Sequence, residues 1–128
     1  MNLQTPLGKV RGLGSAGNGV HHWWMQRLTA VALVPLGAWL LVSLVTLPSL
    51  DFVTVASWMG GTWTASLLTL FVLTASWHSS LGVQVIIEDY VHDHGLKTVT
   101  LVLSGFVHAL LAALGVFAVL RVAFGSPI

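Results

Sequence analysis

Three long stretches without a charged residue constrain the fold of this chain more than any other feature of its sequence. No Asp, Glu, Lys or Arg occurs in the 23 residues from 28 to 50, the 36 from 52 to 87 or the 23 from 98 to 120. A helix that crosses a bilayer needs about 20 predominantly apolar residues. The first and third stretches have that length, and the second holds one span after an interfacial loop over residues 51–61 that contains adjacent glycines. The sequence therefore predicts three transmembrane helices, over approximately residues 25–48, 62–87 and 97–122.

Composition supports a membrane protein and excludes several other classes. Hydrophobic residues make up 55% of the chain and charged residues 7%, against roughly a quarter charged in ordinary soluble domains. The net charge is +1, so there is no basic stripe to bind nucleic acid. The chain has no cysteine, which excludes a disulfide framework, a thiolate metal site and an iron–sulfur cluster held by this chain. We expect residues 1–128 to form a single all-α membrane domain.

The ends of the predicted spans indicate their orientation. Residues 1–22 contain five glycines and no apolar core of signal-peptide length, so we expect an irregular, uncleaved N-terminal arm. Four of the five basic residues lie on one side of the spans and Arg121 lies on the other; the four are Lys9, Arg11, Arg27 and Lys97. The positive-inside rule then predicts a cytoplasmic N-terminus and a C-terminus outside, in the periplasm of a bacterium.

Two histidines lie within predicted spans, where an ionisable side chain is costly and indicates a partner or a function. His78 is ten residues before Glu88 and His108 is eleven after Lys97, so both lie about 15 Å below the same interface. Small neighbours of His78 leave space for a flat macrocycle such as haem, whose iron commonly takes a neutral imidazole as axial ligand. They are Ala75, Ser79, Ser80 and Gly82.

Each histidine also has other interpretations. His78 is either an iron ligand or a histidine that only hydrogen-bonds a neighbouring helix. His108 has small neighbours as well, and its matching depth allows it to ligate the same iron from within this chain. Spacing alone leaves these alternatives open.

Polar residues at the cytoplasmic boundary form a second candidate site. Arg27 opens the first span and is suited to a bidentate pair with a haem propionate, or it only anchors the helix at the headgroups. Tyr90 provides a neutral donor that suits the carbonyl oxygen of a lipid-soluble quinone, and the adjacent Asp89 suits proton transfer. Most of the charged run from 88 to 94 is expected to be a solvated face.

Three segments of the chain carry a resemblance to a known family. They are LGSAG at 13–17, VHHWWMQRLTA at 20–30 and HSSLGVQVIIEDYVH at 78–92. Together they resemble the smaller hydrophobic membrane-anchor subunit of bacterial succinate dehydrogenase, respiratory complex II. The most specific part is His78-x-x-x-Gly82 followed by Asp89-Tyr90-Val91, and the resemblance covers nearly the whole chain.

The resemblance implies a role for each candidate residue. His78 corresponds to one axial ligand of haem b, with the second ligand supplied by a partner anchor (cytochrome b) subunit. Arg27 corresponds to a residue that contacts a haem propionate, and Asp89 and Tyr90 to residues at the ubiquinone pocket. FAD and the iron–sulfur clusters belong to the flavoprotein and iron–sulfur subunits, which such an anchor docks to the inner membrane. The chain alone is then expected to catalyse nothing.

Two other functions are compatible with the same residues. One is a self-contained small cytochrome b that binds haem through His78 and His108. The other is a haem-free transmembrane scaffold, whose histidines make hydrogen bonds between helices. His21, His22, His92 and His94 are left without an assigned role.

Overall fold

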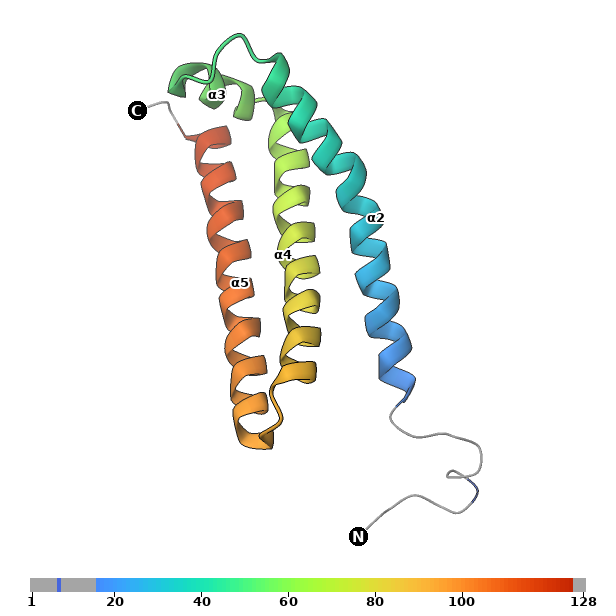
Figure 1. The fold of residues 1–128 in the computed structure, drawn as a ribbon. Helices are drawn as coiled ribbons and strands as arrows, with labels where there is room; N and C mark the ends of the chain where they lie inside the picture. Colours follow the sequence, from blue (N-terminus) through green and yellow to red (C-terminus); the bar gives the residue numbers. More distant parts are fainter. Residues whose placement is uncertain (1–6, 8–15, 126–128) are drawn as a thin grey trace.

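The computed structural model describes residue 7 and residues 16 to 125, and in that part of the chain all regular structure is helical. Three of the helices are long and apolar enough to cross a membrane. This confirms the predicted all-α membrane protein with three spans. The elements are α2 (Ala16–Thr46), α3 (Phe52–Met59), α4 (Thr62–Tyr90) and α5 (His94–Phe124) (Figure 1).

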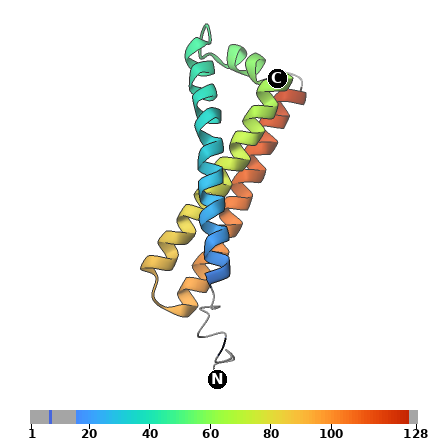
Figure 2. The same cartoon turned by 90° about the vertical axis from the view of Figure 1, so that its right-hand side faces the viewer.

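Helix α4 is the central element of the bundle. It packs against both α2 and α5, whereas the backbones of α2 and α5 do not approach each other closely within residues 16 to 125. Figure 2 shows α2 crossing the α4–α5 pair at an angle. The short helix α3 lies across one end of the bundle and contacts α4 and α5. The start of α2 and the α4–α5 connection lie at the other end (Figure 1).

Two segments differ from the sequence-based expectation. The expected irregular arm over residues 1–22 is helical from Ala16 onward, because no proline interrupts this segment and glycine weakens a helix without preventing it. Most of the arm before that residue lies outside the described residues. The expected loop over residues 51–61 contains helix α3, which Asp51 caps by accepting a hydrogen bond from the Thr54 N–H at 3.0 Å.

The interior of the bundle is small, and most large apolar side chains face outward. Among the described residues, the buried hydrophobic side chains are Leu36, Ala65, Leu68 and Val119. Trp39 of α2 stacks on Trp58 of α3, with ring centroids 6.0 Å apart. An outward apolar surface of this kind is stable where lipid surrounds the helices, because lipid tails are as apolar as the side chains.

Helices α4 and α5 pack tightly at Gly115. A Cβ placed on Gly115 would lie 2.7 Å from Cγ1 of Val72, whereas one placed on Gly105 would meet nothing within 4 Å. A valine in a helix has essentially one favoured rotamer, so Val72 has little freedom to move aside. The glycine at position 115 therefore permits close packing of α5 on α4, whereas the glycine at position 105 faces open space.

We predict that Gly115→Ala lowers the thermal stability of the assembled protein. The added methyl group overpacks the α4–α5 contact, an effect that typically costs about 1–3 kcal/mol. The measurement is the apparent Tm in detergent, with Gly105→Ala as the control because it gains the same helix propensity without the clash. Equal Tm values for the two variants would contradict the packing argument.

The cap of α3 provides a pH-dependent prediction. Hydrogen bonds from the Ser49 hydroxyl and from the N–H and hydroxyl of Thr54 lower the pKa of Asp51 far below its ordinary value of 3.8. A carboxyl group with a lowered pKa in the folded state contributes stability above the unfolded pKa, and that contribution is lost as the pH falls below about 4. We expect the amide protection factors of α3 to fall on acidification. Asp51→Asn keeps a capping side chain that does not titrate. An equal fall in the α3 protection factors of this variant on acidification would contradict the prediction.

Candidate functional site

His78 lies on the side of α4 that faces α2. Its Nδ1 atom is 3.0 Å from the Thr29 hydroxyl of α2. Ser79, the next residue, makes a hydrogen bond to α5 instead. Successive helical residues are about 100° apart around the axis, so α4 presents adjacent residues to different neighbours.

The other ring nitrogen of His78 is available to a ligand. The imidazole is half-buried, and its Nε2 makes no hydrogen bond among the residues that the structure describes. The side chain thus has one nitrogen oriented by α2 and one nitrogen that a metal ion is able to approach. This is the usual arrangement of a metal-binding histidine, whose second nitrogen is held by a hydrogen bond.

Both ring nitrogens of His108 are occupied. Nδ1 lies 2.8 Å from the Ser104 carbonyl oxygen, which only accepts, so this nitrogen carries the hydrogen. Nε2 then accepts from the Ser79 hydroxyl at 3.2 Å. His78 engages α2 and His108 bonds to α4 from the α5 side. The structure therefore does not bring the two predicted iron ligands together.

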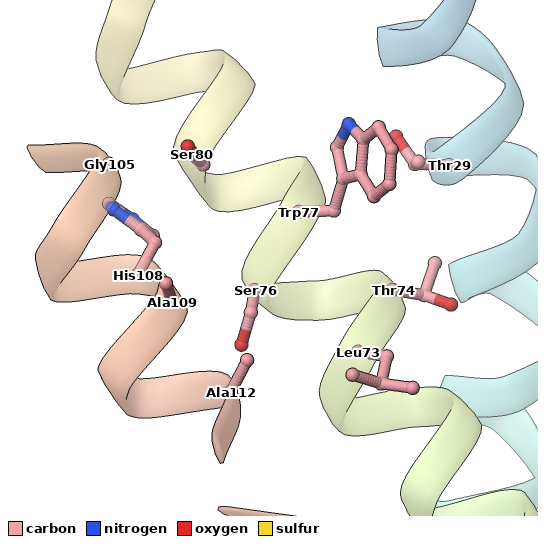
Figure 3. A pocket seen from close by; sticks show the side chains of 10 residues that line it. All are labelled: Thr29, Leu73, Thr74, Ser76, Trp77, Ser80, Gly105, His108, Ala109 and Ala112. Carbon is pink, nitrogen blue, oxygen red and sulfur yellow. The ribbon is translucent and has the colours of Figure 1, made fainter. Parts of the chain in front are cut away.

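An open groove of about 520 Å³ runs beside His108. Figure 3 shows His108 projecting from α5, with Trp77 of α4 and Thr29 of α2 on the opposite side of the groove. Small residues of α5, including Gly105 and Ala109, form part of its wall. His78 is not among the residues that line it. The groove is thus separate from the free nitrogen of His78.

The predicted slot of small residues beside His78 is not formed as expected. Ser79 bonds to α5, and Ser80 lines the groove beside His108. Gly82 remains on the α2 side, where an added Cβ would lie 3.7 Å from the Gln26 Nε2 atom. Neighbours counted along the sequence are distributed around the axis of a helix, so only part of the small set lies on the His78 side of α4.

The remaining predicted residues lie at two levels of the bundle. Asp89 and Tyr90 end α4, whereas Arg27 is the twelfth residue of α2, two before the Thr29 that contacts His78. Arg27 is exposed, and its guanidinium lies 5.3 Å from the centre of the Trp23 ring. Asp89 and Tyr90 are the last residues of α4 and are also exposed, Tyr90 to 78%. Tyr90 is twelve residues beyond His78, which corresponds to about 18 Å along the helix. The structure thus places the histidine and the Asp–Tyr pair in two separate sites.

Sequence reasoning missed a polar face on α2. His22, Gln26 and Thr29 follow helical spacing on the side of α2 toward α4. His22 Nε2 and Gln26 Oε1 are buried atoms without a hydrogen-bond partner in the described part of the chain. Polar residues that recur every third or fourth position in an apolar helix are the signal that would have identified this face.

Several residues of the charged run have structural roles. Asp93 caps α5 by accepting a hydrogen bond from the Leu96 N–H at 2.7 Å. Lys97 donates to the Glu88 carbonyl oxygen at 3.0 Å, near the end of α4. Within the described residues, no three His, Cys, Asp or Glu side chains group closely enough to hold a metal ion by themselves. Any metal at His78 therefore needs ligands from outside this chain or from a cofactor.

Comparison with known proteins gives a consistent set of relatives. Residues 1–120 match the family model for the succinate dehydrogenase/fumarate reductase transmembrane subunit. A succinate dehydrogenase hydrophobic membrane anchor subunit of Rickettsia bellii is 32% identical over 102 residues, which are 79% of this chain and 81% of that protein. The subunit of the same name from Paracoccus denitrificans is 29% identical over 126 residues, 98% of this chain and 97% of that one. No solved structure gives a significant match.

Proposed function

The chain belongs to the succinate dehydrogenase/fumarate reductase transmembrane subunit family and has the role of a succinate dehydrogenase membrane anchor; from this premise we propose that it binds one haem b together with a second anchor subunit. We further propose that it forms part of a ubiquinone-reducing site and docks the iron–sulfur and flavoprotein subunits to the membrane. The chain has no cysteine, so the clusters that deliver electrons belong to a partner. The share of this chain is to position and orient the redox groups.

The arrangement around His78 is the observation that supports haem binding. Its Nδ1 is held by Thr29 and its Nε2 is free, which is the donor set that an axial imidazole requires. When bound, haem supplies reversible one-electron transfer at its iron. His78 would provide one axial nitrogen, and the apolar helices around it would exclude water from that nitrogen.

The second axial ligand is proposed to come from the partner anchor. His108 is a poor second ligand because both of its nitrogens already have partners and it lies on the other side of α4. The position of His78 on a partly exposed surface suits a haem shared between two subunits. The hydrogen bonds of His108 thus argue against the self-contained cytochrome.

Arg27 is proposed to hold a haem propionate. Its guanidinium lies over the Trp23 ring, and Arg27 is two residues before the Thr29 that contacts His78. A guanidinium binds a carboxylate through two parallel hydrogen bonds, and its charge offsets that of the propionate. The residue is exposed, so this contact requires no rearrangement of the bundle.

The end of α4 is proposed as this chain's part of the quinone site. The Tyr90 hydroxyl is suited to donate a hydrogen bond to a quinone carbonyl oxygen, and the Asp89 carboxyl is suited to pass a proton to it. Both side chains are exposed in the chain alone. The second anchor and the iron–sulfur subunit would complete the pocket. We place this end, with the N-terminus, on the cytoplasmic side.

A haem-free scaffold is the second candidate function. The observation that favours it is that both intramembrane histidines make hydrogen bonds between helices, His78 to Thr29 and His108 to Ser79. The Nε2 atom of His78 separates the two functions. A structural role uses only the Nδ1 bond to Thr29, whereas haem binding also uses Nε2. Membranes that contain the assembled chain but show no b-type absorbance would favour the scaffold.

We predict that His78→Ala removes haem from the assembled complex, whereas His108→Ala retains it. The first variant lacks the proposed axial nitrogen, and the second loses only the bonds to Ser79 and Ser104. The measurement is the reduced-minus-oxidised spectrum, with haem expressed per mole of purified complex. Loss of the bis-histidine spectrum in His108→Ala would favour the self-contained cytochrome instead.

We predict that Tyr90→Phe lowers quinone reductase activity about three- to tenfold, the equivalent of one lost hydrogen bond. Succinate oxidation with an artificial soluble acceptor should remain near its original rate, because that electron transfer takes place in the partner subunits. The two activities are measured on the same purified complex. Equal loss of both would indicate failed assembly and would contradict the assigned contact.

A further inference from the structure

The Thr29 hydroxyl lies within hydrogen-bond distance of three groups. It is 2.8 Å from the Met25 carbonyl oxygen, 3.1 Å from the Gln26 carbonyl oxygen and 3.0 Å from Nδ1 of His78. A hydroxyl has a single hydrogen and two lone pairs. The shortest of the three contacts is to the Met25 carbonyl oxygen, which only accepts, and this favours a hydrogen directed to the backbone of the same helix. The oxygen then offers a lone pair to His78.

With the hydrogen of Thr29 assigned to its own backbone, the hydrogen of the His78 ring belongs on Nδ1. A lone pair on Nδ1 would face a lone pair of the hydroxyl across 3.0 Å, whereas an N–H there completes a hydrogen bond. A neutral imidazole has one N–H, so the lone pair is left on Nε2. The carbonyl oxygens of α2 thereby determine the tautomer of His78 on α4.

We propose that Thr29 is a positioning residue that holds the iron-binding imidazole of His78 through an Nδ1–H to hydroxyl hydrogen bond. The inference rests on the proposed function, because it concerns the same imidazole when Nε2 binds haem iron. Donation from Nδ1–H to an oxygen acceptor makes an imidazole a stronger electron donor to its metal. A stronger donor stabilises ferric over ferrous iron, so Thr29 holds the haem reduction potential down.

The chain offers a matched control on the same helix. Thr46 donates to the carbonyl oxygens of Val42 and Ser43 at 2.8 and 3.1 Å, the same pattern as Thr29, but no histidine contacts it within the described residues. Thr46→Val therefore removes an equivalent hydroxyl and its backbone bond. Thr29→Ser keeps the hydroxyl and removes only a methyl group.

The test is the midpoint potential of haem b in the purified complex. We expect Thr29→Val to raise the midpoint potential by about 59 mV. For a one-electron couple this corresponds to a roughly tenfold weaker preference for ferric over ferrous iron. Thr29→Ser and Thr46→Val should keep the original potential. Loss of haem from Thr29→Val alone, with haem retained in the other two, would equally support the positioning role.

Three results would overturn the inference. One is a potential in Thr29→Val that equals or falls below that of Thr46→Val. Another is loss of haem from Thr29→Ser as well as Thr29→Val, because the hydroxyl would then not be the important group. The third is full haem content in His78→Ala, which would overturn the proposed function as well. If His78→Ala loses haem and Thr29→Val keeps the original potential, only the role of Thr29 is refuted.

Discussion

The absence of water from the bilayer core is the constraint on which the rest of this structure depends. A polar side chain at that depth must find its hydrogen-bond partner within protein. In this chain the central helix α4 supplies those partners in both directions, with His78 bonded to Thr29 of α2 and Ser79 bonded to His108 of α5. Two adjacent residues thus join all three spans, and the Nε2 of His78 that faces no partner within the described residues is the basis of the proposed haem site.

The outer surface of the chain follows from the same constraint. Large apolar side chains cover the outside of the helices, and few are buried between them. Lipid tails are able to solvate this surface, but they make no hydrogen bonds to the exposed Arg27 of α2 or to the exposed Asp89 and Tyr90 at the end of α4. These residues suit a chain whose functional sites are completed by other subunits. A family of membrane anchors is consistent with that architecture.

The sequence predicted what depends on charge spacing and hydropathy. It identified the three spans, because their number and approximate positions follow from counting uncharged residues along a helix of known rise. It missed helix α3 and the Thr29 contact. The first depends on a local cap at Asp51, and the second on how two helices rotate against each other, which spacing within one helix does not determine. The small residues around His78 were misread for that second reason.

The distance between the backbones of α2 and α5 has a consequence for assembly of the bundle. Helices α4 and α5 are joined by only three residues, 91 to 93, and pack against each other. They are able to enter the bilayer and pair as a hairpin without help from α2. The Thr29–His78 bond forms only when the first span packs against this hairpin, so the orientation of the imidazole depends on the docking of α2.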